Sequence, residues 1–165
     1  RYERKVFAPV SYAPETGQTD EFGPPVTFGG NVTFMGYASD DEGAYAPGSI
    51  LTLVTYWRVD GLVPRDLRLF THVLADPGAA PVANTDTIST QARLLQNRDV
   101  IVQVTYVPLP DTIPPGEYRV SIGAYQDTSL QRLDVLRDGD PFGTRIFLFT
   151  INVADPDSST EDGES

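Results

Sequence analysis

The 165-residue chain contains no cysteine. This absence excludes disulfide bonds, thiolate zinc sites and cysteine nucleophiles, although it does not fix the cellular compartment. Histidine, methionine and tryptophan each occur once. No apolar run reaches the roughly 18 residues that cross a bilayer, and no signal peptide is visible. Because the sequence starts at Arg1 without an initiator methionine, we expect it to be part of a longer protein.

Basic residues are scarce. The 12 Lys and Arg residues stand against 23 Asp and Glu residues, which gives a formal net charge of −11. Five of the acidic residues lie in the last eleven positions, so removing their charges from −11 leaves −6 for the rest. Either charge argues against a nucleic-acid partner, because phosphate binding needs a basic surface. It argues equally against simple adsorption to anionic lipid.

The common catalytic motifs are also missing. The sequence contains no G-x-S-x-G elbow, no H-E-x-x-H and no P-loop. The single histidine, His72, falls within a strand on the face of Phe70 and Leu74, and we interpret it as a half-buried, hydrogen-bonded structural residue. A general base needs an orienting partner, and the sequence names none. Carboxylates are plentiful, but nothing singles out the pair that a glycosidase needs. We therefore expect no catalytic residue in this chain.

The clearest pattern that is present lies in residues 111–126 (DTIPPGEYRVSIGAYQ). The prolines and the glycine predict a turn, because proline fixes φ and glycine lets the backbone reverse. Apolar residues then alternate with the others, which predicts a strand with one face on a core. The apolar positions are Tyr118, Val120, Ile122 and Ala124. We expect the Tyr118 hydroxyl to tie this strand to the preceding turn, as in a tyrosine corner.

Similar β-rich runs recur along the chain between turns rich in glycine and proline, which number 14 each. Residues 49–59 form the longest run, with Trp57 on the core side. The last run, residues 145–153, should turn Phe147, Phe149, Ile151 and Val153 towards the core. Residues 90–96 could form a helical turn or a loop that crosses between sheets.

These runs predict an all-β protein. We expect an antiparallel β-sandwich of about seven to nine strands, immunoglobulin-like or jelly-roll-like. Residues 1–25 should form an extended lead-in or linker, and residues 26–154 the sandwich domain. Residues 155–165 are predicted to be a disordered acidic tail, since they contain almost no apolar side chains.

Two kinds of residue could bind a ligand. Tyr45 and Tyr125 are the candidates for sugar binding, because both fall near loops and aromatic rings can stack on sugars. Clustered carboxylates could bind calcium, since hard cations prefer oxygen ligands. Neither acidic cluster matches an EF-hand, and the alternative for each cluster is a solvated turn. Calcium is the only cofactor that the sequence suggests. The two clusters are Asp40, Asp41 and Glu42, and Asp138 and Asp140.

Several motifs follow one another in a recognisable order. They are residues 47–57 (PGSILTLVTYW), 69–78 (LFTHVLADPG), 82–86 (VANTD) and 114–125 (PPGEYRVSIGAY), followed by Arg132 and Leu133. In this order they resemble the C-terminal β-sandwich domain of bacterial polytopic membrane glycosyltransferases of the dolichyl-phosphate-mannose protein mannosyltransferase type. The similarity spans roughly residues 6–153, and it departs from the family pattern at residues 94–98 and 126–129.

The resemblance implies a domain of the cell envelope, outside the cytoplasmic membrane, tethered through an N-terminal region that this chain lacks. It carries over no catalytic residue, because the catalytic groups of such enzymes belong to the membrane part. The leading hypothesis is a non-catalytic accessory domain that recognises or positions a glycan or an acceptor protein. The alternative is a purely structural or protein-interaction sandwich without a small ligand, and a glycoside hydrolase is the weaker alternative.

Overall fold

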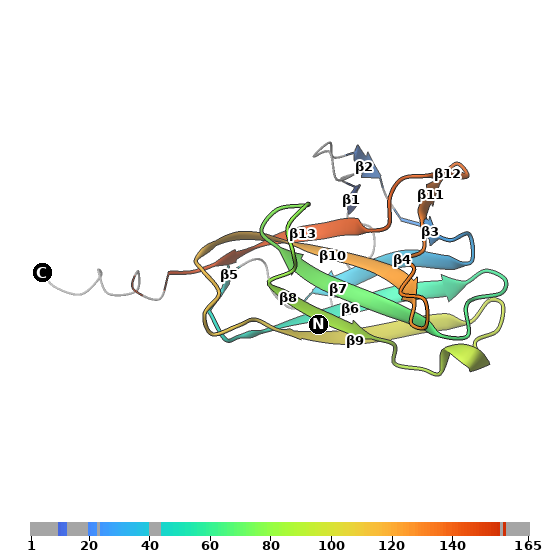
Figure 1. The fold of residues 1–165 in the computed structure, drawn as a ribbon, viewed down its shortest axis with the longest axis horizontal. Coiled ribbons are helices and arrows are strands. Elements are labelled where there is room, and N and C mark those ends of the chain that lie inside the picture. The colour runs from blue at the N-terminus through green and yellow to red at the C-terminus, as the bar shows by residue number, and fades with distance from the viewer. Residues whose placement is uncertain (1–9, 13–19, 23, 40–43, 156, 158–165) are drawn as a thin grey trace, which may run out of the picture.

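The structure is a computed structural model that describes residues 10–12, 20–22, 24–39, 44–155 and 157. Two β-sheets pack face to face (Figure 1), which confirms the predicted antiparallel sandwich. Seven strands of five or more residues form the framework: β4 (Val32–Ser39), β6 (Ile50–Val59), β7 (Leu67–Leu74), β8 (Ala83–Thr87), β9 (Val100–Pro108), β10 (Gly116–Gln126) and β13 (Ile146–Val153).

Shorter strands extend the sheets. These strands of two or three residues are β1 (Val10–Tyr12), β2 (Asp20–Phe22), β3 (Val26–Phe28), β5 (Ala44–Tyr45), β11 (Val135–Arg137) and β12 (Asp140–Pro141). A 3₁₀ helix, η1 (Ala92–Leu94), lies in the connection that carries the chain from β8 in one sheet to β9 in the other. Residues 90–96 are thus both a helical turn and a crossing loop. No helix in the described part of the chain is long and apolar enough to span a membrane.

The strand order is that of an immunoglobulin-like sandwich. Sheet A has the order β2-β1-β13-β10-β7-β8, with β5 pairing parallel to β13, and sheet B has the order β12-β11-β3-β4-β6-β9. In immunoglobulin nomenclature, β4, β6 and β9 take the places of strands A, B and E. The strands β7, β8, β10 and β13 take the places of C, C′, F and G. Of the two predicted alternatives, this order matches the immunoglobulin-like one.

The core lies between the sheets and centres on Trp57. Trp57 is 1% exposed, and its ring centroid lies 5.4 Å from that of Phe28 and 5.3 Å from that of Phe34. Its indole nitrogen donates to the Thr55 hydroxyl at 2.8 Å, which satisfies the polar atom of a buried ring. Alternate residues of β6 are buried because β6 lies between β4 and β9 with one face on the core.

The predicted tyrosine corner is confirmed. The Tyr118 hydroxyl donates a hydrogen bond of 2.7 Å to the carbonyl oxygen of Pro114, while the residue is only 5% exposed. Gly116, at φ 148°, begins β10 in a conformation that favours glycine. The corner therefore fixes where β10 starts, and β10 lies at the centre of sheet A between β13 and β7.

Candidate functional site

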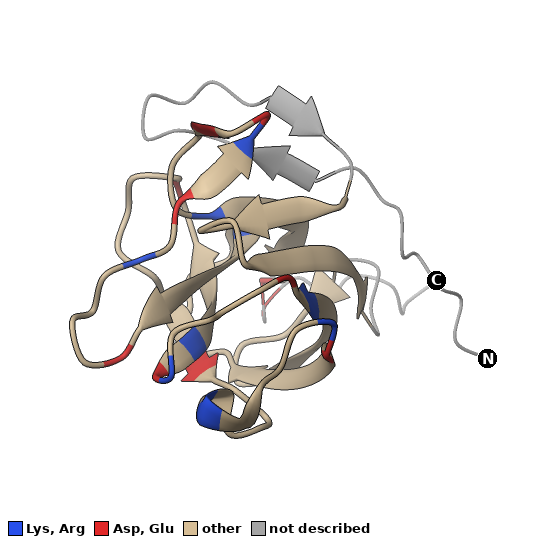
Figure 2. Cartoon of the chain, turned by 90° about the vertical axis from the view of Figure 1, so that its right-hand side faces the viewer, with Lys and Arg blue, Asp and Glu red and all other residues tan. Residues whose placement is uncertain are grey.

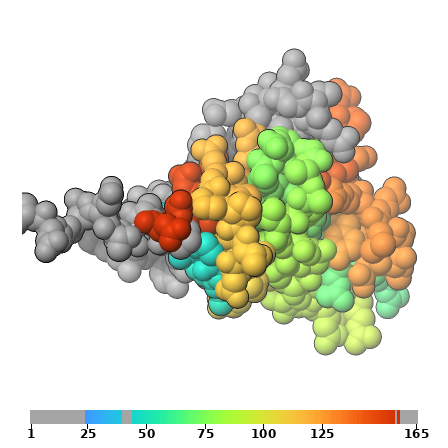
Figure 3. Space-filling model, turned by 60° about the vertical axis from the view of Figure 1, so that its left-hand side comes forward, coloured from blue at the N-terminus to red at the C-terminus, as the bar shows by residue number. Residues whose placement is uncertain are grey.

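A small cavity opens on the outer face of sheet A. Its volume is about 170 Å³, and it is lined by Phe70, His72, Asp86, Tyr125, Leu130 and Arg132. Figure 3 shows this part of the surface, where the green atoms of β7 and β8 border the orange atoms of the segment that follows β10. The volume is well below the roughly 300–1,000 Å³ of drug-sized pockets. The cavity therefore suits one small chemical unit.

Strand pairing places the lining residues on the outer face. Within β7, Leu67, Leu69 and Val73 point into the core, so the intervening residues point outwards. Phe70 and His72 consequently share one face, as the alternation predicted, and that face lies on the opposite side of sheet A from the sandwich core. Both residues are nevertheless buried, at 2% and 7% exposure.

The ring of Phe70, which lines the cavity, packs against the backbone of Gly123 in β10. A Cβ atom at Gly123 would come within 2.2 Å of Phe70 Cζ and 2.7 Å of the Thr144 carbonyl oxygen. Only glycine leaves room for the ring here. The guanidinium of Arg132 lies over the same ring, with its Cζ atom 4.7 Å from the ring centroid. Phe70 therefore contacts both the backbone at Gly123 and a cation.

The wall that carries Arg132 is the segment that follows β10. Its backbone folds back along β10, where the N–H of Leu133 donates to the Ala124 carbonyl at 2.8 Å and Tyr125 forms a bridge with Arg132. Asp66 fixes the same segment through Thr128, whose backbone N–H donates to Asp66 Oδ2 at 2.8 Å. The hydroxyl and backbone N–H of Thr128 hold the pKa of the Asp66 carboxyl below its usual value.

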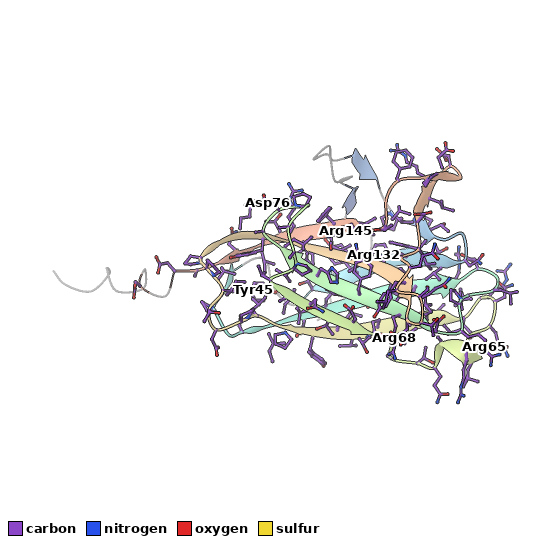
Figure 4. The ribbon with its side chains drawn as sticks, in the orientation of Figure 1. Tyr45, Arg65, Arg68, Asp76, Arg132 and Arg145 are labelled. Carbon is purple, nitrogen blue, oxygen red and sulfur yellow. The ribbon has the colours of Figure 1, made fainter. Side chains whose placement is uncertain are left out.

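Burial controls the charge of His72. Desolvation lowers its pKa from 6.5 to about 4, because burial disfavours the charged ring. Asp86 opposes this shift, while Arg132 and Arg145, labelled in Figure 4, reinforce it. The imidazole is therefore neutral at neutral pH, with Nε2 lying 3.6 Å from Asp86 Oδ1. Its Nδ1 atom is buried without a hydrogen-bond partner among the described residues.

Tyr125 combines a partly buried ring with an acidic neighbourhood. Burial raises the pKa of its hydroxyl, and the carboxylates of Asp86 and Asp127 raise it further. Asp127 also lies 3.7 Å from the Nε atom of Arg68. The tyrosine therefore stays protonated at neutral pH and lines the cavity as a neutral hydroxyl beside a carboxylate. Tyr125 is one of the two tyrosines that we proposed from the sequence as sugar-binding residues.

The structure places Tyr45, the other proposed tyrosine, in the core. Tyr45 is only 7% exposed, because β5 pairs with the end of β13 and directs the ring inwards with the core cluster. Its ring therefore offers little area to a sugar, and burial argues against the sequence-based proposal of Tyr45 as a sugar-binding residue. Its proximity in sequence to a loop did not reveal this pairing.

Of the two acidic clusters, only Asp138 and Asp140 lie in the part of the chain that the structure describes. Asp40, Asp41 and Glu42 lie outside the described residues. Asp138 and Gly139, with φ of 51° and 84°, form the tight turn between β11 and β12, where Asp140 pairs with Arg137. Among the described residues, no three His, Cys, Asp or Glu side chains gather where they could hold a metal ion. Asp138 and Asp140 thus lie in a tight turn, the alternative to a calcium site that the sequence left open.

Sequence reasoning missed four of the residues that line the cavity, namely Phe70, Asp86, Leu130 and Arg132. They come from separate segments, and only the register of β8 on β7 places Asp86 opposite Phe70. Among the described residues that line the cavity, Asp86 is the only carboxylate, whereas a glycosidase uses a pair. The cavity can thus bind and orient a polar unit, but it lacks this catalytic arrangement. No protein-family model and no curated protein matches the sequence.

Proposed function

We propose that this chain is a non-catalytic, extracytoplasmic accessory domain of a membrane glycosyltransferase-like protein, and that it recognises a glycan through the cavity beside Tyr125. The order of the sequence motifs supports the parent protein and the location. The sandwich fold is compatible with a recognition domain, but folds of this kind serve many functions. The proposal for recognition therefore depends on the site itself.

The observation that carries the proposal is the composition of the cavity wall. A tyrosine ring, a carboxylate, an imidazole and a guanidinium surround one small opening. A sugar ring presents apolar C–H faces together with hydroxyl groups that both donate and accept hydrogen bonds. Tyr125 can contact such a face, while Asp86 can accept from hydroxyl groups and Arg132 can donate to them. An apolar ligand would leave the polar groups of Tyr125, Asp86 and Arg132 without hydrogen-bond partners, so a polar ligand is favoured.

An NMR titration of amide resonances with bacterial cell-envelope oligosaccharides, with and without calcium, tests this proposal. We expect shifts that concentrate on β7, β10 and the segment after β10, and we expect Tyr125→Ala to weaken them. Tyr106→Ala is the matched control, because Tyr106 is 60% exposed on β9 and does not line the cavity. An unresponsive cavity at millimolar sugar would contradict glycan recognition.

A second candidate, a protein-interaction domain, is favoured by the outer face of β9. All four outward side chains along its centre are apolar and exposed, and Ile50 on neighbouring β6 is 57% exposed. A solvated sheet face normally carries polar side chains at these positions. The exposed residues of β9 are Val100, Val102, Val104 and Tyr106, at 64%, 51%, 42% and 60%.

The free edge of β9 is less open to a protein partner than its outer face is. Side chains already donate to three carbonyl groups along this edge: Thr85 to Tyr106 at 2.8 Å, Gln103 to Val104 at 2.9 Å and Ser89 to Val102 at 3.4 Å. Such capping opposes pairing with another strand. A protein partner would therefore pack against the face of β9. Broadening of β9 amide resonances on adding the rest of the parent protein would favour this candidate over the glycan proposal.

A further inference from the structure

Arg132 forms no ion pair with a described carboxylate, although Asp86 lines the same cavity. Ion pairs in the described residues join Arg58 with Asp60 and Arg68 with Asp127. Arg132 takes part in neither, although the chain as a whole is acidic, with a net charge of −11. Figure 2 shows basic and acidic positions interspersed around one end of the sandwich. In an acidic chain, an arginine that lines a cavity without an ion-pair partner suggests that the cavity binds an anionic group.

The position of the guanidinium leaves its hydrogen-bond donors available. It lies over the face of Phe70, 4.7 Å from the ring centroid, and makes no side-chain hydrogen bond to a described residue. A guanidinium above an aromatic ring keeps N–H groups that can bind a carboxylate in a two-pronged geometry. The contact with Phe70 also restricts the side chain before any ligand arrives, which lowers the entropic cost of binding.

The rest of the cavity limits where a negative charge can lie. Asp86 repels a second carboxylate, and the neutral imidazole of His72 supplies no positive charge at neutral pH. An anionic group is therefore favoured only on the side of Arg132, while Asp86 and the Tyr125 hydroxyl suit uncharged hydroxyl groups. A ligand that satisfies both sides has one carboxylate and several hydroxyls on a small ring.

We propose that the cavity selects a sugar unit that bears a carboxylate, such as a hexuronic acid, and that Arg132 binds this carboxylate. This inference depends on the proposed glycan recognition and narrows its ligand class. It assigns Arg132 the role of the specificity-determining residue. Tyr125 and Asp86 then contact the parts of the ring that neutral and acidic sugars share.

Titrations with three probes test the inference on the full 165-residue chain. Glucuronate, glucose and glucose 6-phosphate are added separately at fixed ionic strength and pH 7, and amide shifts give each affinity. We expect glucuronate to bind about tenfold or more tightly than glucose, since a charge-assisted pair adds to contacts that both share. Arg132→Gln should remove this advantage, and Arg132→Lys should retain only part of it because lysine lacks the planar fork.

Arg119→Gln is the matched control. Arg119 also lies over a phenylalanine on the outer face of sheet A, with its Cζ 5.6 Å from the Phe147 ring centroid, but it does not line the cavity. We expect this variant to prefer glucuronate as the wild type does. Unfolding curves for each variant confirm that the comparison is made between folded proteins, and Arg132→Lys preserves the test if Arg132→Gln unfolds.

The outcomes separate the two proposals. Equal binding of glucose and glucuronate at the cavity overturns the selection for a carboxylate but supports glycan recognition. Equal binding of glucuronate and glucose 6-phosphate, both dependent on Arg132, overturns the choice of a carboxylate over a phosphate. If none of the three probes shifts cavity resonances while longer envelope oligosaccharides do, the inference fails alone. If no sugar does, both proposals fail.

Discussion

Replacing Gly123 by alanine is the most direct test of how Phe70, which lines the cavity, packs against β10. The added methyl group would lie 2.2 Å from Phe70 Cζ and 2.7 Å from the Thr144 carbonyl oxygen. The first contact can be relieved if the ring moves, but the second involves backbone and cannot easily be relieved. Because Phe70 is 2% exposed, a displaced ring must also open a void or expose apolar surface.

Overpacking of this kind costs typically about 1–3 kcal/mol. With one side-chain and one backbone collision, we expect Gly123→Ala to lower the free energy of unfolding by about 3 kcal/mol. For a domain of this size, that corresponds to a fall of roughly 6–12 °C in Tm. Urea denaturation followed by circular dichroism measures the loss. Gly78→Ala is the control, because nothing lies within 4 Å of a Cβ there, and its effect should stay within about 0.5 kcal/mol.

A double-mutant cycle shows whether Phe70 causes the cost. Leucine at position 70 removes the ring edge that the new methyl group meets, so Gly123→Ala should cost about 1 kcal/mol less in a Phe70→Leu background. The residual cost would belong to the contact with Thr144. A Gly123→Ala variant as stable as Gly78→Ala would refute the packing of Phe70 against β10, and with it the cavity as described.

Three further predictions follow from individual contacts. Tyr118→Phe removes the donor to the Pro114 carbonyl and should cost about 1–2 kcal/mol by urea denaturation, whereas Tyr106→Phe on the exposed face of β9 should be neutral. Ser121→Ala should leave stability unchanged or raise it by up to about 1 kcal/mol, because this fully buried hydroxyl has no partner among the described residues; a loss above 1 kcal/mol would contradict this. Lowering the pH from about 6.5 to about 4 should reduce the free energy of unfolding by at most about 3 kcal/mol through His72, since only the unfolded chain binds a proton there in that window. The NMR midpoint of His72 should lie near pH 4, and His72→Gln should flatten this part of the stability profile.

Local patterns were enough to predict the framework. The alternation in residues 111–126 gave both the strand β10 and the corner at Tyr118, because period-two burial and a turn before a tyrosine depend on neighbouring residues alone. The same reasoning correctly placed Trp57 in the core. These features are encoded within a dozen residues and need no knowledge of the partner strand.

Alternation failed where a sheet irregularity changes the register. The sequence predicted that Phe147, Phe149, Ile151 and Val153 face inwards. The register of β13 on β10 shifts between Val120 and Ser121, so Phe147 instead packs with Leu74 on the outer face. Ile151 and Val153, beyond the shift, lie in the core as predicted. A β-bulge changes the parity of every later position, and one strand read alone does not reveal it.

The cavity could not be predicted from the sequence for a related reason. Arg132 reaches Phe70 only because residues 131–133 continue along β10 beyond the last residue that β13 pairs with, Ile122. The two side chains are 62 positions apart, and no local pattern links them. Tyr125 could be proposed because it ends a predictable strand, whereas its cavity partners depend on three strand registers together.

The outer face of sheet A holds features that the stability of the sandwich does not require. The inner core already buries the large apolar side chains that hold the two sheets together. The outer face adds a glycine that weakens a central strand, a depressed histidine pKa and two buried polar atoms without described partners, on His72 and Ser121, which face each other across β7 and β10. The glycine and the unpartnered polar atoms cost stability, the depressed histidine pKa does so below about pH 6.5, and all lie beneath or beside the cavity. Departures from ordinary packing rules are expected at functional sites, and here they gather beside Arg132 and Tyr125.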